Sequence, residues 1–267
     1  MSKKIHLLVI DPQNDFVKPD GALSVLGADK DMDRLSVMVD RLRHKLDDIH
    51  VTLDSHHLVH IAHPIFWKDS KGNHPAPFTM ISVSDVENGV WVPYMPSYYK
   101  RSLEYLRALE VGKRYPHVIW PPHCLISSEG HGVYKPLFEA LKRWEEQEFA
   151  VVDFVTKGSN CFCEHFSVIC SEVPDPNDPT TQINTSFIQT LQDADEILLA
   201  GEAGSHCLAN SVSDLVKNFS NPDYIKKLVL LTDATSPVTG FEKNQEDFIN
   251  EMTAKGMRVS TTVDYLK

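Results

Sequence analysis

Short apolar runs alternate along this chain with longer segments of helical spacing. The run from Ile5 to Ile10 is almost entirely apolar, which is typical of a parallel strand covered on both faces. Five further short runs predict strands at 49–53, 149–155, 197–200, 227–232 and 258–262. Apolar positions three and four residues apart predict helices at 31–46, 99–109, 135–147, 161–171, 186–191 and 242–254, and another beginning near residue 207.

Alternating strands and helices predict an α/β fold. The expected architecture is a three-layer α/β/α sandwich around a central, mostly parallel sheet of about six strands. No repeat, low-complexity tract or linker divides the sequence, so residues 1–267 are predicted to form a single domain. The stretch 55–99 is rich in His, Pro, Gly and aromatic residues and lacks regular spacing. Since long loops in compact domains are usually functional, we interpret it as an irregular active-site loop region.

Composition limits the possible binding partners and the cellular compartment of the protein. A net charge of −11 argues against nucleic acid, because phosphate binding needs a basic face. No apolar run approaches the roughly 20 residues that a membrane-spanning helix needs, so no membrane partner is expected. The five cysteines are odd in number and unevenly spaced, unlike a disulfide framework. We therefore expect a reduced, cytoplasmic protein.

Chemically reactive residues stand at the ends of several predicted strands. Asp11, Asp54 and Lys157 each follow such a strand, and the strand 197–200 leads through a Gly-rich turn to Cys207. In parallel α/β sheets, ligands bind at the carboxyl ends of the strands, so this coincidence favours an enzyme. Taken singly, Asp11 is equally compatible with a turn cap and Lys157 with a solvated cation.

Cys207 has two interpretations. At the start of a helix, a thiol ionises more easily and the first backbone N–H groups can hold an oxyanion. A neighbouring Asp11 could accept its proton, and Lys157 could lower the cysteine pKa below its free value of about 8.5. The alternative is a buried structural cysteine, which behaves as a small apolar residue.

A second set of residues is typical of a metal site. Asp54 and His56 lie two apart on a predicted loop, and the distant His123 could complete a facial set for one divalent ion. Such a site is expected to position substrate rather than to activate the nucleophile. The neighbouring His57 and His63 are interpreted as parts of a polar surface.

Five sequence blocks carry a resemblance to a known family. They are Asp11-Pro12-Gln13-Asn14-Asp15-Phe16, Gly21-Ala22-Leu23-Ser24-Val25, Trp120-Pro121-Pro122-His123-Cys124, Lys157-Gly158, and the stretch from Gly201 to Cys207. In this order they resemble the signature of nicotinamidases and pyrazinamidases in the isochorismatase-like cysteine hydrolase superfamily. The blocks extend over nearly the whole chain, and the resemblance implies the isochorismatase-like hydrolase fold.

The resemblance implies roles for individual residues. Asp11 would be the general base, Lys157 the charge stabiliser and Cys207 the nucleophile. A cis peptide bond would precede Ala203, and the N–H groups of Ala203 and Cys207 would form an oxyanion hole. A divalent metal, with zinc the expected ion, would bind the pyridine nitrogen of the substrate. Its ligands would be Asp54, His56 and His123, and the substrate-binding residues would be Phe16, Trp120 and His206.

The activity implied is conversion of nicotinamide to nicotinate and ammonia through a thioester, in NAD salvage. Two alternatives remain: a related amidase acting on another small amide, and a catalytically silent binding module of the same fold. Isochorismate hydrolysis is disfavoured, because it gives the metal ligands no role. The resemblance also implies self-association into a homo-oligomer. Gly204-Ser205 replaces the family's Thr-Asp and Phe166-Ser167 its Tyr-Ser, and both changes bear on the substrate.

Overall fold

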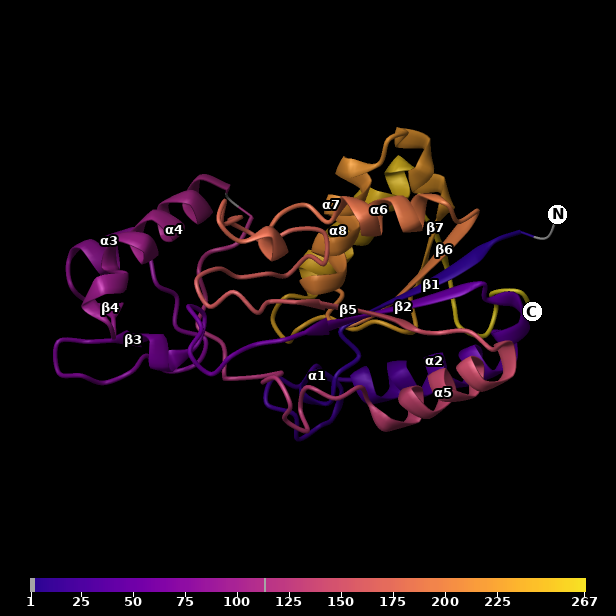
Figure 1. Cartoon of the computed structure of the whole chain (residues 1–267), viewed down its shortest axis with the longest axis horizontal. Coiled ribbons are helices and arrows are strands. Elements are labelled where there is room, and N and C mark those ends of the chain that lie inside the picture. The colour runs from indigo at the N-terminus through magenta and orange to yellow at the C-terminus, as the bar shows by residue number, and fades with distance from the viewer. Residues whose placement is uncertain (1–2, 113) are drawn as a thin grey trace.

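A six-stranded parallel sheet forms the centre of the molecule (Figure 1). The computed structural model describes residues 3–112 and 114–267. The strands follow one another across the sheet in the order β5-β2-β1-β6-β7-β8, and every pair is parallel. Their bounds are β1 Ile5–Ile10, β2 Asp48–Asp54, β5 Asp153–Lys157, β6 Glu196–Gly201, β7 Leu228–Leu231 and β8 Arg258–Ser260.

Helices cover both faces of this sheet, which confirms the predicted three-layer α/β/α fold (Figure 1). One face is covered by α1 (Asn14–Val17), α2 (Ala28–Leu42) and α5 (Lys135–Glu148). The other is covered by α6 (Thr185–Gln192), α7 (Cys207–Asn218) and α8 (Glu242–Lys255). Within the described residues, no helix combines the length and the apolar character that crossing a membrane requires.

The apolar run of β1 supplies both layers of the core. Leu7 and Val9 pack into the cluster beneath α2 and α5, whereas Leu8 and Ile10 pack into the cluster beneath α6, α7 and α8. Successive side chains of a strand point to opposite faces, so a strand covered on both sides needs apolar residues throughout. All six residues of β1 are buried accordingly.

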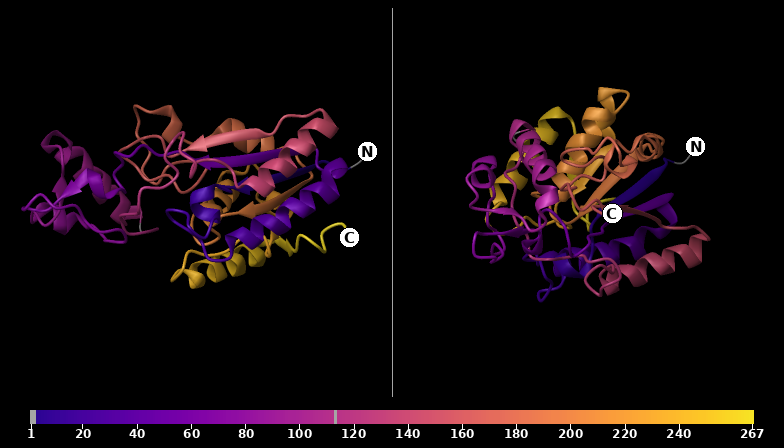
Figure 2. Two further views of the ribbon diagram at one scale, coloured as in Figure 1. Left: turned by 90° about the horizontal axis from the view of Figure 1, so that it is seen from below. Right: turned by 60° about the vertical axis from the view of Figure 1, so that its left-hand side comes forward.

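A small lobe projects beyond the carboxyl ends of the strands (Figures 1 and 2). It contains β3 (Trp67–Lys68), α3 (Val83–Glu87), β4 (Val92–Pro93) and α4 (Tyr99–Gly112), with 3₁₀ turns at Pro64–Phe66 and Pro96–Tyr98. The stretch 55–99, expected to be irregular, therefore carries short regular elements. They enclose their own apolar cluster, whose members include Phe66, Trp67, Leu106 and Ile119.

Most predicted elements are present, with two exceptions. The strand expected at 149–155 begins later, because Phe149 caps α5 in the left-handed conformation and is almost fully exposed. The helix predicted at 161–171 is wrong. Its backbone groups bond to distant partners instead, since Ile61 N–H donates to Cys161 O and Val168 N–H to Ser211 Oγ. Further 3₁₀ turns occur at Arg43–Lys45, Pro179–Thr181 and Pro222–Lys227.

Candidate active site

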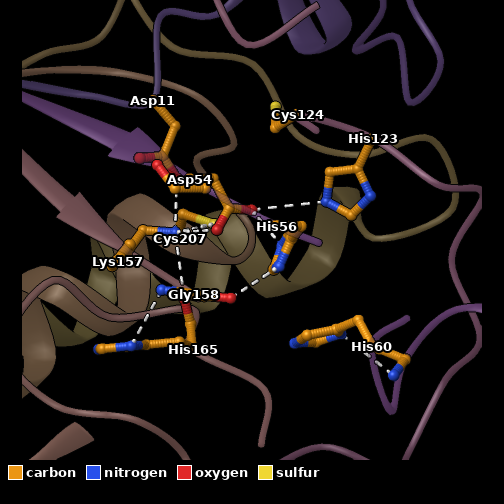
Figure 3. A network of polar contacts seen from close by, with 12 residues as sticks. Asp11, Asp54, His56, His60, His123, Cys124, Lys157, Gly158, His165 and Cys207 are labelled. Atoms are coloured by element: carbon orange, nitrogen blue, oxygen red, sulfur yellow. Dashed lines mark hydrogen bonds and ion pairs between the residues drawn. The ribbon is translucent and has the colours of Figure 1, made fainter. Parts of the chain in front are cut away.

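Lys157 is the centre of a buried charged cluster at the carboxyl edge of the sheet (Figure 3). Its Nζ lies 2.8 Å from Asp11 Oδ2 and 3.2 Å from Asp54 Oδ1. The same nitrogen lies 3.7 Å from Cys207 Sγ and donates to the His165 carbonyl at 3.1 Å. The structure thus brings together the three residues predicted to react and one predicted metal ligand.

Strand order explains how residues far apart in the sequence meet here. β1, β2 and β5 are adjacent, and in the β2–β5 register Asp54 lies directly beside Lys157. Asp11 follows the end of β1 and adopts φ 43°, in the left-handed region that Asp tolerates better than most residues. Thr52 of β2 fixes the Asp11 side chain, because its hydroxyl donates to Asp11 Oδ1 and accepts from Asp11 N–H at 3.0 Å.

The charged groups of the cluster are almost inaccessible to solvent. Burial would lower the pKa of Lys157, but the Asp11 and Asp54 carboxylates raise it above its ordinary value, so the amine stays charged. Burial raises the pKa of Asp11, while Lys157 and Thr52 limit the rise. Burial also raises the pKa of Cys207 above that of a free thiol, and Lys157 only partly offsets this. The predicted lowering of the cysteine pKa is therefore wrong: Cys207 rests as a thiol and needs a base.

Asp54, His56 and His123 form a group able to hold one metal ion. One potential ligand atom from each lies within 4.8 Å of the others, and all three side chains are buried. His56 Nδ1 bonds to Gly158 O at 3.1 Å and His123 Nδ1 to Pro121 O at 2.8 Å. Because a carbonyl can only accept, both rings carry hydrogen on Nδ1, which leaves Nε2 as the atom available to a metal. His56 Nε2 donates to Asp54 Oδ2 at 2.9 Å and His123 Nε2 lies 3.4 Å from the same oxygen, so a bound divalent ion would take the place of the hydrogen between these groups. The residues therefore fit a divalent ion.

Gly158 makes room for these ligands. Its φ is +86°, a conformation that L side chains rarely adopt. A Cβ at this position would lie 2.7 Å from Asp54 Oδ1 and 2.9 Å from His56 Cε1. The Lys157-Gly158 pair thus combines a reactive amine with the space that the metal-ligand group requires.

Two further histidines pack beside these ligands. The ring centroids of His60 and His63 lie 4.4 and 5.4 Å from that of His56. His57 is exposed, as expected, but the interpretation of His63 as a surface residue is wrong because it is fully buried. Burial lowers the pKa of His63 to about 3, so its ring is neutral. The rings of His56, His60 and His123 pack around it, and the apolar spacing around residue 63 does not indicate this packing.

The turn before Cys207 has the predicted cis peptide bond between Glu202 and Ala203. Gly204 has no space for a side chain, because a Cβ there would lie 2.0 Å from Gln245 Oε1. Ser205 Oγ accepts from Val238 N–H at 3.0 Å and bonds to His206 Nδ1 at 2.9 Å. The Gly204-Ser205 replacement therefore fits a turn packed tightly against the segment that leads into α8.

A narrow pocket opens onto Cys207. The three residues predicted to bind substrate, Phe16, Trp120 and His206, all line it together with Asp54, His123, Ala203 and Cys207. Burial lowers the pKa of His206 to about 4, so the His206 ring is neutral. The pocket wall combines aromatic rings with polar groups at one end, an arrangement typical of sites for small ring compounds.

Two residues of this site are not predicted from the sequence. Thr52 orients Asp11, and Glu164 lines the pocket with a side chain that is almost completely buried. The position of Thr52 in a buried strand, two residues before Asp54, is a signal in the sequence. Glu164 has no such signal, because it lies in the segment predicted to be a helix. Phe166, whose replacement of the family's Tyr bears on the substrate, also lines the pocket.

Known structures share this fold. A nicotinamidase/pyrazinamidase from Acinetobacter baumanii matches with a TM-score of 0.65 and 20% sequence identity, over 98% of this chain and 98% of that chain. The yeast nicotinamidase matches with a TM-score of 0.65 and 18% identity, over 96% of this chain and 98% of that one. A Pyrococcus horikoshii pyrazinamidase in complex with zinc gives 0.56 and 17%, over 97% and 99%.

Comparison of sequences alone finds no match. No protein-family model matches the chain, and no curated protein is significantly similar to it. Identities of 20% and below establish a common fold and leave the chemistry to be argued from the residues. The chain thus has the three-layer α/β/α architecture seen in these nicotinamidase and pyrazinamidase structures, over 96–98% of its length.

Proposed function

We propose that this protein is a metal-dependent cysteine amidohydrolase that converts nicotinamide to nicotinate and ammonia. One observation carries the proposal: Lys157 Nζ lies within 2.8 Å of Asp11 Oδ2 and 3.7 Å of Cys207 Sγ, beside a buried Asp-His-His group. A nucleophile, a base and a cation thus share one pocket with a group suited to a metal. Structures of the same fold support the choice of substrate, since the protein from L. infantum is in complex with nicotinate.

The reaction divides into two steps. Asp11 takes the thiol proton of Cys207 as the sulfur bonds to the amide carbon, and the N–H groups of Ala203 and Cys207 hold the oxyanion. Asp11 returns that proton to the departing nitrogen, so the C–N bond breaks, ammonia leaves and a thioester remains. Water then attacks the thioester with Asp11 as its base, which releases the acid and restores the thiol. Lys157 stays charged in both steps and stabilises negative charge on the Asp11 carboxylate and on the Cys207 sulfur.

The Asp54, His56 and His123 group gives the substrate its orientation. A divalent ion bound there, with zinc the proposed ion, would supply a Lewis-acid contact to the ring nitrogen. Phe16, Trp120 and His206 would enclose the ring and exclude water. A reducing cytoplasm suits this chemistry, because the thiol must stay reduced. The conversion of nicotinamide to nicotinate suits a place in NAD salvage.

Release of ammonia tests the proposal. Full-length protein with added zinc is expected to convert millimolar nicotinamide to equal amounts of ammonia and nicotinate, measured by a coupled ammonia assay and by chromatography. Benzamide, which lacks the ring nitrogen, serves as the matched control and should be a much poorer substrate. No ammonia from nicotinamide would contradict the proposal, and no ammonia from any amide would favour a silent binding module.

A second candidate is hydrolysis of a different small amide. The observation favouring it is Glu164, a carboxyl group in the pocket wall that can accept a hydrogen bond from a substituted ring. Ammonia released from a ring-substituted amide, with little from nicotinamide, would support this alternative.

Removing the metal is expected to raise KM more than it lowers kcat. The reason is that the metal held by Asp54, His56 and His123 would contact the ring, whereas Cys207 attacks the amide with Asp11 as its base. A chelator followed by dialysis, with metal content checked by atomic absorption, should raise KM by about tenfold or more, equivalent to about 1.4 kcal/mol. Readdition of zinc should reverse the effect. Unchanged kinetics in protein verified to be metal-free would contradict a positioning role.

A further inference from the structure

Glu202 is a buried acid beside the turn that leads to Cys207. It follows Gly201 at the end of β6 and precedes the cis bond to Ala203. Its side chain is inaccessible to solvent, and its N–H donates to the Ile10 carbonyl at 2.7 Å. None of the proposed catalytic roles uses this carboxyl group.

The Glu202 carboxyl group meets a second carboxyl group, that of Asp31 in the first turn of α2. Glu202 Oε2 accepts from Ser236 N–H at 3.0 Å, while Glu202 Oε1 has no donor among the described residues. Ser236 bridges the two carboxyl groups, because its N–H donates to Glu202 Oε2 and its hydroxyl donates to Asp31 Oδ2 at 2.6 Å. Two ionised carboxylates held side by side in a buried site repel each other, so we infer that one of them holds a proton.

Geometry assigns that proton to Glu202. Asp31 already accepts two hydrogen bonds, from Ser236 Oγ at 2.6 Å and from the Arg34 guanidinium, which favour its ionised form. Burial raises the pKa of Glu202 well above its ordinary value, and the Asp31 charge raises it further. A neutral Glu202 can therefore donate from Oε1 to the Asp31 carboxylate.

This carboxyl pair is tied to the backbone on either side of Ala203. Gly201 N–H donates to Ala234 O and Gly204 N–H to Ser236 O, both at 2.9 Å. Ser236 thus binds both carboxyl groups and also the turn itself. Any movement of this pair is transmitted to the peptide unit whose N–H is proposed to hold the oxyanion.

We propose that protonated Glu202 is a positioning residue, which holds the Ala203 N–H in place through a proton that it donates to Asp31. This inference rests on the proposed amide hydrolysis. Loss of the proton places two carboxylates side by side and displaces the turn, so oxyanion stabilisation falls as the pH rises through the Glu202 pKa. Glu202 touches no reacting atom and acts only through the turn.

The surrounding groups do not neutralise a second charge. From α2 only Arg34 faces the pair, and Arg34 also approaches Asp233 Oδ2, at 3.9 Å. From the segment after β7, Ser236 contributes neutral donors to the pair. From α8, Gln245 reaches the neighbouring Gly204 and carries no charge. Within the residues that the structure describes, this one cation serves three carboxylates, and ionisation of Glu202 is uncompensated.

The test compares Glu202→Gln and Glu202→Leu with the full-length wild type. Glutamine keeps a neutral donor to Asp31, so it should retain wild-type kcat below the Glu202 pKa and lose the fall in kcat that the wild type shows as the pH rises through that pKa. Leucine removes the donor, so kcat should fall about tenfold or more at every pH with little change in KM. Glu251→Gln, an exposed acid on α8 paired with Lys255, is the matched control and should follow the wild type.

Thermal unfolding provides a readout that needs no substrate. Because the pKa of Glu202 is raised in the folded protein, wild-type stability should fall as the pH rises through that pKa, and Glu202→Gln should lack this fall. If the wild type releases ammonia but the wild-type and glutamine profiles coincide, this inference is overturned and the proposed function stands. If no amide is hydrolysed, coincident unfolding profiles still overturn the shared proton, and divergent ones support it.

Discussion

Replacing Cys207 by alanine should abolish amide hydrolysis, with kcat reduced about 10⁴-fold or more. Cys207 lines the pocket, and the other described residues that line it carry neither a hydroxyl group nor a thiol that could replace it as the nucleophile. The measurement is ammonia release at saturating nicotinamide, with folding checked by circular dichroism. A folded variant with near wild-type turnover would exclude Cys207 as the nucleophile.

The matched control for this variant is Cys161→Ala. Cys161 is a free cysteine like Cys207. It is half-buried, and it lies in a separate surface hollow beside His57 and Arg101. Its removal should leave turnover unchanged. Comparable losses in both variants would indicate damage to the fold rather than removal of a nucleophile.

Replacing Lys157 by methionine should both destabilise and inactivate the protein. The substitution leaves Asp11 and Asp54 buried without their shared cation, and breaking a buried ion pair from one side costs about 3–5 kcal/mol. Urea unfolding measures that loss. Lys255→Met, which breaks an exposed pair with Glu251, is the control and should cost about 0.5 kcal/mol or less.

A double substitution separates stability from catalysis at this site. Adding Asp11→Asn to Lys157→Met removes one uncompensated charge, so part of the lost stability should return. Activity should not return, because the double variant lacks both the base and the cation. A Lys157→Met variant within about 1 kcal/mol of the wild type would show that the cluster is not held by this charge.

The sequence predicted the strands and their reactive ends, because a buried parallel strand must be apolar on both faces. Ile5 to Ile10 shows this, and the turn after it exposes Asp11 at the sheet edge. The order of the strands in the sheet could not be predicted from hydrophobic periodicity, because the spacing of apolar residues does not indicate that β5 pairs with β2. That pairing is what puts Lys157 beside Asp54.

Tertiary contacts explain what periodicity missed. The segment 161–171 has helical spacing, but its backbone is bonded to residues 61 and 211 and follows those partners instead. His63 was predicted to be a surface residue, but it is buried by packing against other histidines, including the distant His123. The pKa of Cys207 could not be judged either, since it depends on how completely water is excluded. Each error concerns long-range contacts, which local patterns do not encode.

The small lobe is an excursion of the chain whose two ends meet. Trp120 N–H donates to Ala62 O at 2.7 Å, and His117 Nε2 bonds to Ile61 O at 3.1 Å. The entropy lost in closing a loop grows only slowly with its length, by about 0.6 kcal/mol for each doubling. Lengthening or shortening the chain between these ends therefore changes the free energy of folding of the main domain only slightly. The lobe can change in size through insertion and deletion while the sheet and its reactive edge keep their geometry.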